Sequence, residues 1–215
     1  MKGLFGLIRQ TAPATVAGDN PDTFLFSTAF ADQGIDASLL VPWEARANEV
    51  GAKRMPAGRG SKLLEQLWRE DSFMARLGPG TVPRLEKFFD FAVLPASRDV
   101  IRQDEYGNFM LVLLSGCIAV DREQPWGERL RLTEARPGDI LGEMSLLDSG
   151  QRFSVCTSLT DCEVAVLGAQ ALDEMMTTDP ALAASLIGLL ARKLSRRMRV
   201  VSTRLCDKNA DRPWP

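Results

Sequence analysis

One short stretch of the sequence, residues 137–152, carries residue types that suit an anionic sugar phosphate. Gly142 has no Cβ, so the backbone can turn sharply there and a ligand can approach it closely. Residues 144–147 are expected to form one helical turn whose free N–H groups attract an anion. Arg152 stays charged at any working pH, and its planar guanidinium matches phosphate oxygens. Because a carboxylate repels phosphate, Glu143 fits this site as an acceptor for ribose hydroxyls.

At these residues the sequence resembles the cyclic nucleotide-binding domain family. Members of that family carry a phosphate-binding cassette that reads Phe-Gly-Glu-Leu-Ala-Leu-Leu, a short variable loop, Pro-Arg and then small residues. The matching segment here is Leu-Gly-Glu-Met-Ser-Leu-Leu at 141–147, followed by a three-residue loop and Gln151-Arg152. The chain departs from the family pattern at Leu141, at Gln151 and above all at Phe153, where the family usually has Ala, Ser or Thr.

The resemblance extends over roughly residues 80 to 205. Residues 100–116 are similar to the family's strand, acidic-glycine turn and second strand, and residues 136–139 match its next turn. Residues 161–167, followed by a long helix, are similar to the bacterial catabolite activator and its relatives.

The resemblance implies a ligand and a set of residues that bind it. The expected ligand is a cyclic nucleotide, with cyclic AMP favoured because guanine recognition in the family often uses a hydroxyl where this chain has Phe153. No cofactor, metal site or catalytic residue is expected. The predicted ligand-binding residues are Leu141, Gly142, Glu143, Met144, Ser145, Arg152, Phe153, Arg196 and Arg197.

The composition excludes several other functions. The chain has 215 residues, 45% of them hydrophobic and 25% charged, which is typical of a globular protein. The formal net charge of −2 gives no overall attraction to nucleic acid. Without histidine, the Ser-His-Asp and Cys-His mechanisms and all His-bearing zinc sites are excluded, so no enzyme is expected. Four scattered cysteines and the lack of a membrane-length apolar run favour a cytoplasmic protein with reduced thiols.

The periodicity predicts an α+β fold in which an antiparallel jelly roll is flanked by helices. Short apolar runs split by turn residues between 92 and 167 are typical of such a sandwich. Before it, helices are expected at 62–76 and 82–91. The predicted organisation is an irregular N-terminal extension at 1–60, a helical lead-in at 61–91, the nucleotide-binding domain at 92–205 with helices from 170 onward, and a short tail at 206–215.

The last helix is predicted to be long, from about Pro180 to Leu205. Its apolar residues keep a three-four spacing that favours a homodimer, or alternatively a stripe packed on the β-roll of the same chain: Ile187, Leu190, Leu194, Met198, Val201 and Leu205. The basic residues of 192–204 are interpreted as a solvated face from which one or two arginines reach the nucleotide. The tail that follows is too short and proline-rich for a helix-turn-helix, so specific DNA binding is not expected.

Two hypotheses for the function follow. In the first, the chain is a cyclic nucleotide sensor that signals to an unidentified protein partner by repositioning its long helix and N-terminal segment. In the second, it is an interaction scaffold that keeps the fold but has lost the ligand. The bulky ring of Phe153 beside the phosphate site supports the scaffold, whereas the presence of Gly142, Glu143 and Arg152 together supports the sensor.

Overall fold

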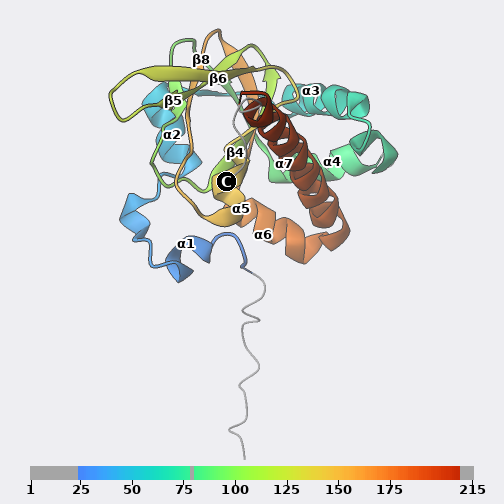
Figure 1. Ribbon diagram of the computed structural model, residues 1–215. Helices are drawn as coiled ribbons and strands as arrows, with labels where there is room; N and C mark the ends of the chain where they lie inside the picture. Colours follow the sequence, from blue (N-terminus) through green and yellow to red (C-terminus); the bar gives the residue numbers. More distant parts are fainter. Residues whose placement is uncertain (1–23, 78–79, 209–215) are drawn as a thin grey trace, which may run out of the picture.

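The computed structural model describes residues 24–77 and 80–208, and it contains two antiparallel sheets with helices packed around them (Figure 1). The first sheet has the order β1-β2-β9-β4-β7, formed by Lys53–Arg54, Asp90–Leu94, Cys162–Gly168, Phe109–Ser115 and Ile140–Leu141. The second has the order β3-β8-β5-β6, formed by Asp99–Ile101, Val155–Ser158, Ile118–Glu123 and Arg129–Ala135. This arrangement confirms the predicted α+β sandwich.

The helices of the described residues occur before, between and after the strands. They are α1 Ala29–Asp32, α2 Trp43–Val50, α3 Ala57–Glu70, α4 Thr81–Leu85, α5 Glu143–Asp148, α6 Ala169–Thr178 and α7 Pro180–Lys208, with 3-10 turns η2 Ala37–Leu39, η3 Met74–Leu77 and η4 Glu86–Phe88. None of them has both the length and the apolar character that crossing a membrane requires.

Strand β4 is the centre of the molecule because it is buried on both faces. Met110, Val112 and Leu114 belong to the core formed with the helices, because alternate residues of a strand point to the same face. Leu111 and Leu113 point the other way, into the core between the two sheets. The strand therefore carries an almost continuous apolar run, and its position fixes the cassette strand β7, which pairs with it.

The lead-in helices begin and end at different residues from those predicted. Helix α3 begins at Ala57 instead of Lys62, and the second helix is only the short α4, because residues 90–91 belong to strand β2. The reason is tertiary: β2 pairs along its whole length with β9, and that ladder overrides the local helical pattern.

The N-terminal extension is more ordered than the sequence indicates. Residues 1–23 lie outside the described residues, but residues 24–60 contain α1, η2, α2, β1 and the first turn of α3. Contacts distant in sequence hold this segment: the backbone N–H groups of Phe26 and Ser27 donate to the carboxylate of Asp173 in α6, at 2.9 and 2.8 Å. The prediction of an irregular extension is therefore corrected for residues 24–60, which contain helices and a short strand.

The long helix α7 begins as predicted, with Pro180 in its first turn and Asp179 capping it through a hydrogen bond from the Leu182 N–H group (3.2 Å). Its apolar stripe is divided between two environments. Leu190 is fully buried in the core of the same chain, whereas Met198 and Val201 are exposed. The side chain of Leu205 lies outside the described residues.

Candidate functional site

The candidate site begins where strand β7 ends at a glycine with a left-handed backbone. Gly142 has φ 78° and ψ 5°, a conformation that residues with a Cβ rarely adopt. A Cβ at this position would also lie 2.6 Å from Nη1 of Arg152 and 3.2 Å from the carbonyl oxygen of Phe109. Both backbone conformation and space therefore require glycine here, and the turn lets the chain pass directly from β7 into α5.

Arg152 is a buried cation held by backbone carbonyls. It is only 3% exposed, and its Nη1 and Nη2 atoms donate to the carbonyl oxygens of Gly142 and Phe109, each at 2.7 Å. Its guanidinium also lies 4.7 Å above the centre of the Phe109 ring. Burial lowers the pKa of Arg152 to about 10, so the group remains charged at neutral pH. No carboxylate of the described residues forms an ion pair with it.

Glu143 is equally buried, but it has a cationic partner. Arg197 of α7 forms an ion pair with its carboxylate and donates a second hydrogen bond, of 2.6 Å, to the carbonyl oxygen of Ile140. One turn earlier, Nζ of Lys193 donates to the carbonyl oxygen of Gly138 at 3.0 Å. Burial raises the pKa of Glu143 above its ordinary value, and the nearby Arg197 partly opposes that rise. Helix α7 is thereby attached to the cassette by two basic side chains.

The other predicted site residues differ in how far they are exposed to solvent. Leu141 and Ser145 are buried, Leu141 in the core between the sheets, while Met144 is exposed. Phe153 is 55% exposed, and the guanidinium of Arg122 from β5 lies 4.5 Å above its ring. The ring of Phe153 thus packs under a surface arginine.

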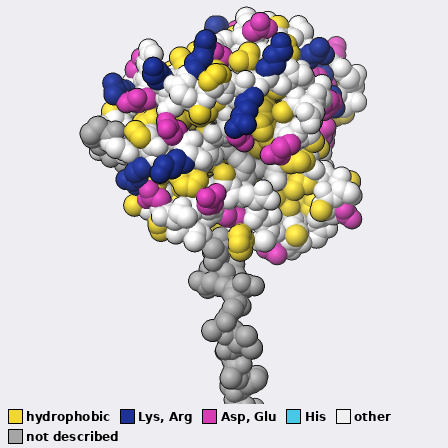
Figure 2. Space-filling model, turned by 180° about the vertical axis from the view of Figure 1, so that it is seen from behind, with side chains coloured by type: hydrophobic (Ala, Val, Ile, Leu, Met, Phe, Trp, Pro, Cys, Tyr) yellow, Lys and Arg dark blue, Asp and Glu magenta, His cyan; other side chains and the backbone are white. Residues whose placement is uncertain are grey.

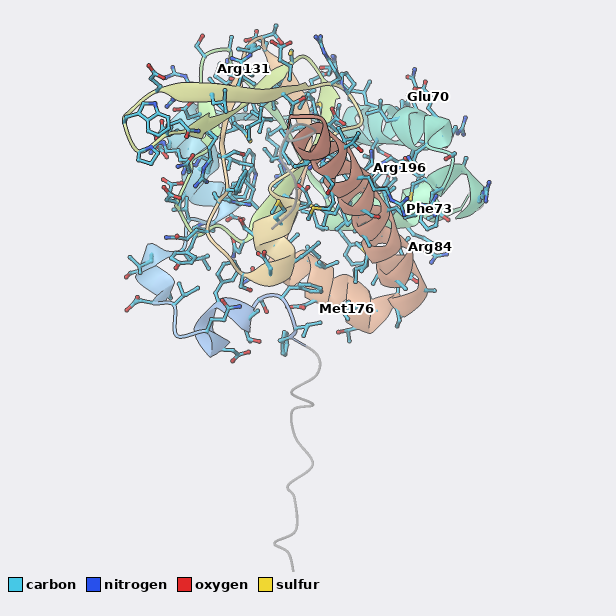
Figure 3. The ribbon with its side chains drawn as sticks, viewed as in Figure 1. Glu70, Phe73, Arg84, Arg131, Met176 and Arg196 are labelled. Carbon is cyan, nitrogen blue, oxygen red and sulfur yellow. The ribbon has the colours of Figure 1, made fainter. Side chains whose placement is uncertain are left out.

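Of the two arginines predicted on α7, the structure brings one to the cassette. Arg197 contacts Glu143, whereas Arg196 is exposed and makes no hydrogen bond or ion pair to the cassette in the described part of the chain. Arg196 projects from α7 on the side where Phe73 and Arg84 lie (Figure 3). One turn earlier on that side, Arg192 lies 5.0 Å above the ring of Phe73.

Several residues in contact with the site were not predicted from the sequence, among them Phe109, Gly107 and Lys193. Phe109 supplies a carbonyl and a ring to Arg152, and a Cβ on Gly107 would lie 2.6 Å from Nη2 of that arginine. Lys193 was assigned only to the solvated face of α7. The glycine at position 107 is the kind of residue that allows the backbone to approach a neighbouring chain segment closely.

The site is identified from its charged groups, and one hollow on the surface lies away from it. A hollow of about 430 Å³ is lined by residues of β1, the start of α3 and β2, among them Arg54, Met55 and Phe89. These elements do not belong to the cassette.

The chain was compared with protein families and curated proteins. Residues 92–179 match the family model described as cyclic nucleotide-binding domain. The CRP-like cAMP-activated global transcriptional regulator of Mycobacterium tuberculosis is 29% identical over 132 residues, which are 59% of this chain and 59% of that protein. The cyclic AMP receptor protein of Thermus thermophilus is 29% identical over 118 residues, 55% of each chain. The matches thus span less than two thirds of these relatives.

Solved structures agree with the family match. The cyclic nucleotide-binding domain of Methylobacillus flagellatus shares the fold, with a TM-score of 0.66 at 20% identity over 73% of this chain and 89% of that one. The Thermus thermophilus catabolite activator protein has a TM-score of 0.54 at 26% identity, covering 66% of this chain and 63% of that one. Residues 92–179, which include Gly142, Glu143 and Arg152, are therefore the part of the chain that is similar to cyclic nucleotide-binding domains.

Proposed function

We propose that the chain is a sensor of a cyclic nucleotide, with cyclic AMP as its preferred ligand. The observation that carries this proposal is Arg152, a buried guanidinium with no carboxylate partner among the described residues. Burying an unpaired charge is costly, and backbone carbonyls compensate for it only in part. A phosphate diester brings the missing negative charge and fits the planar guanidinium.

The second group of the proposed site is Glu143, which would accept hydrogen bonds from a ribose hydroxyl. Its carboxylate is already engaged by Arg197. A ribose that binds there competes with Arg197 for the same oxygens, so ligand binding and the position of α7 are linked. The ligand shifts this equilibrium by as much as its affinities for the two arrangements differ.

The sensor would signal by changing which surface of α7 is accessible to a partner. Residues 195–203 of α7 are exposed and include Met198 and Val201, which we propose as the contact with a second copy or with a protein partner. The cytoplasm as location and the lack of catalytic activity belong to the same proposal.

The alternative function is a ligand-independent interaction scaffold, and one observation favours it. The carboxylate that would bind ribose already has an internal partner in Arg197, so the cassette is stabilised without any ligand. The isolated charge on Arg152 favours the sensor, because a scaffold gains nothing from burying it.

Calorimetric titration of the full chain with cyclic AMP, cyclic GMP and a cyclic dinucleotide tests the two functions. We expect saturable binding of cyclic AMP, and a loss of more than about 1.5 kcal/mol of binding free energy in Arg152→Ala, the low end for a hydrogen bond to a charged group. Arg152→Lys should restore the affinity only in part, because an ammonium cannot make two parallel hydrogen bonds. Absence of binding by the wild type, or equal affinity in all three proteins, would support the scaffold.

A further inference from the structure

Helix α2 lies outside the residues that match the family model, yet one of its faces packs beside the cassette arginine. It lies on the left of Figure 1, across the molecule from α3. Trp43, Arg46 and Val50 are spaced at i, i+3 and i+7, and all three are buried. Trp43 and Arg46 each contact a residue that in turn contacts Arg152: Phe109 in the first case and Glu105 in the second.

The first connection is aromatic. The edge of the Trp43 ring packs on the Phe109 ring, with 5.5 Å between their centres and an angle of 62° between their planes. Arg152 also contacts Phe109: its guanidinium stacks on the Phe109 ring and donates a hydrogen bond to the backbone carbonyl oxygen of Phe109. Trp43 therefore limits where the Phe109 ring can lie, and the Phe109 ring limits where the guanidinium can lie.

The second connection is ionic and runs through Glu105. Arg46 forms ion pairs with Glu49 in its own helix, at 2.6 Å, and with the carboxylate of Glu105. The backbone of Glu105 accepts a hydrogen bond from the N–H group of Arg152 (2.8 Å), and the N–H group of Asp104 donates to the carbonyl of Arg152 (2.9 Å). The loop at residues 102–107 thus holds the backbone N–H and carbonyl groups of Arg152, and Arg46 holds the loop through the carboxylate of Glu105.

The chemistry of Arg46 indicates a role other than stability. The residue is 1% exposed, and its Nε atom is buried without a hydrogen-bond partner in the described part of the chain. A buried ion pair with an unsatisfied donor is a weak contributor to stability, and an apolar residue of similar size would serve the fold as well. A fixed charge, in contrast, holds the loop in one place.

We propose that Trp43 and Arg46 are positioning residues for the ligand, so that α2 is part of the nucleotide site although it lies outside the matched domain. The inference rests on the proposed function, since it assigns α2 to the placement of the arginine that binds the phosphate. It predicts that removal of Arg46 weakens nucleotide binding through Arg152, beyond any loss of fold stability.

The test is titration of the full chain with cyclic AMP in a set of variants. Arg46→Met should weaken binding about tenfold, which is about 1.4 kcal/mol, and Arg46→Lys should restore part of it. Glu105→Gln removes the same ion pair by changing the partly exposed partner of Arg46, and it should also weaken binding. This variant replaces Arg46→Met in the test if Arg46→Met does not fold. Glu44→Ala, an exposed change in the same helix, is the control that should bind like the wild type.

A double-mutant cycle separates positioning from general destabilisation. In an Arg152→Lys background, Arg46→Met should add less than about a twofold loss, because the residue it positions is already altered. A tenfold loss in both backgrounds would mean that α2 acts independently of Arg152, and unchanged affinity of Arg46→Met and Glu105→Gln would overturn the inference while the proposed function stands. If the wild type itself binds no cyclic nucleotide, the proposed function and this inference both fail.

Discussion

At the scale of single residues, Arg152 and Glu143 are equally buried but their charges are compensated differently. The guanidinium of Arg152 contacts two backbone carbonyls and the Phe109 ring but no carboxylate of the described residues, whereas Glu143 is paired with Arg197. A ligand that carries both phosphate and ribose would therefore neutralise the first residue and displace the partner of the second. This asymmetry makes Glu143 the residue whose protonation should control ligand binding.

Nucleotide affinity should decrease as the pH falls, and the decrease should begin above the range of an ordinary glutamate. A carboxylate accepts ribose hydrogen bonds best when it is charged, and burial raises the pKa of Glu143 above its usual value of about 4.3. Binding is thus complete above the raised pKa and is lost as the pH falls through it. Titration calorimetry with cyclic AMP between about pH 4 and 7 measures the profile.

Two variants control this pH experiment. Arg197→Met removes the cation that lowers the pKa of Glu143, so the midpoint should move to higher pH. Glu143→Gln should bind more weakly and with a flat profile. A flat profile in the wild type would show that Glu143 is not the ribose acceptor.

Selectivity for the base is the other property decided by single residues. Phe153 offers no hydroxyl to the exocyclic amine of guanine, so cyclic AMP should bind more tightly than cyclic GMP, and Phe153→Thr should narrow the gap. Arg122 donates to the carbonyl of Phe153 and stacks on its ring, which holds that segment of backbone in place. Competition of both nucleotides against one fluorescent analogue gives the ratio, and tighter binding of cyclic GMP by the wild type would mean that another residue reads the base.

At the scale of elements, one glycine allows helix α3 to pack on the first sheet. A Cβ on Gly60 would lie 2.2 Å from a ring carbon of Phe91, a residue of β2 that is 4% exposed. Gly58, two residues earlier in the same helix, has nothing within 4 Å of the corresponding position.

The two glycines form a matched pair of substitutions. Gly60→Ala should destabilise the fold by about 1–3 kcal/mol through overpacking. Gly58→Ala should leave stability unchanged or raise it by up to about 0.5 kcal/mol, because alanine is the better helix former. Urea unfolding followed by far-UV circular dichroism gives both values. Equal stability of the two variants would contradict the close contact between α3 and β2.

The sequence predicts elements well where the residues that decide them are neighbours. Strand β4 is recognised from its apolar run and α7 from its spacing and its proline start, because both signals are local. Residues 90–91 were assigned to a helix because the ladder with β9, which decides their conformation, lies more than 70 residues away. Helix α2 was missed for the same reason, since Trp43 and Arg46 contact residues about 60 positions away along the chain, Phe109 and Glu105. Within the site, the glycine, the acid and the arginine could be predicted, but the carbonyl of Phe109 could not.

At the scale of the whole molecule, no strongly charged surface on the face seen in Figure 2 favours association with a particular partner. The face seen in Figure 2 carries Lys and Arg side chains interspersed with Asp and Glu, in keeping with the small net charge of −2. Association should therefore depend on apolar contacts. The exposed residues 195–203 of α7 are a candidate for such a contact, because the apolar residues from Leu182 to Leu190 are used by the core of the same chain.

Self-association through α7 is the last prediction, and the structure decides which substitutions test it. Met198 is 67% exposed and Val201 is 49% exposed, so charges placed there leave the domain core intact, whereas the half-buried Leu194 is a less clean target. The wild type should be a dimer in multi-angle light scattering, and Met198→Glu with Val201→Glu should be a folded monomer that still binds cyclic AMP. Thr203→Glu, on the opposite side of the helix by its spacing, should remain dimeric. A wild type that is monomeric at high concentration would assign this exposed surface to a different partner, and a dimer that survives the double substitution would place the interface on another face of the molecule.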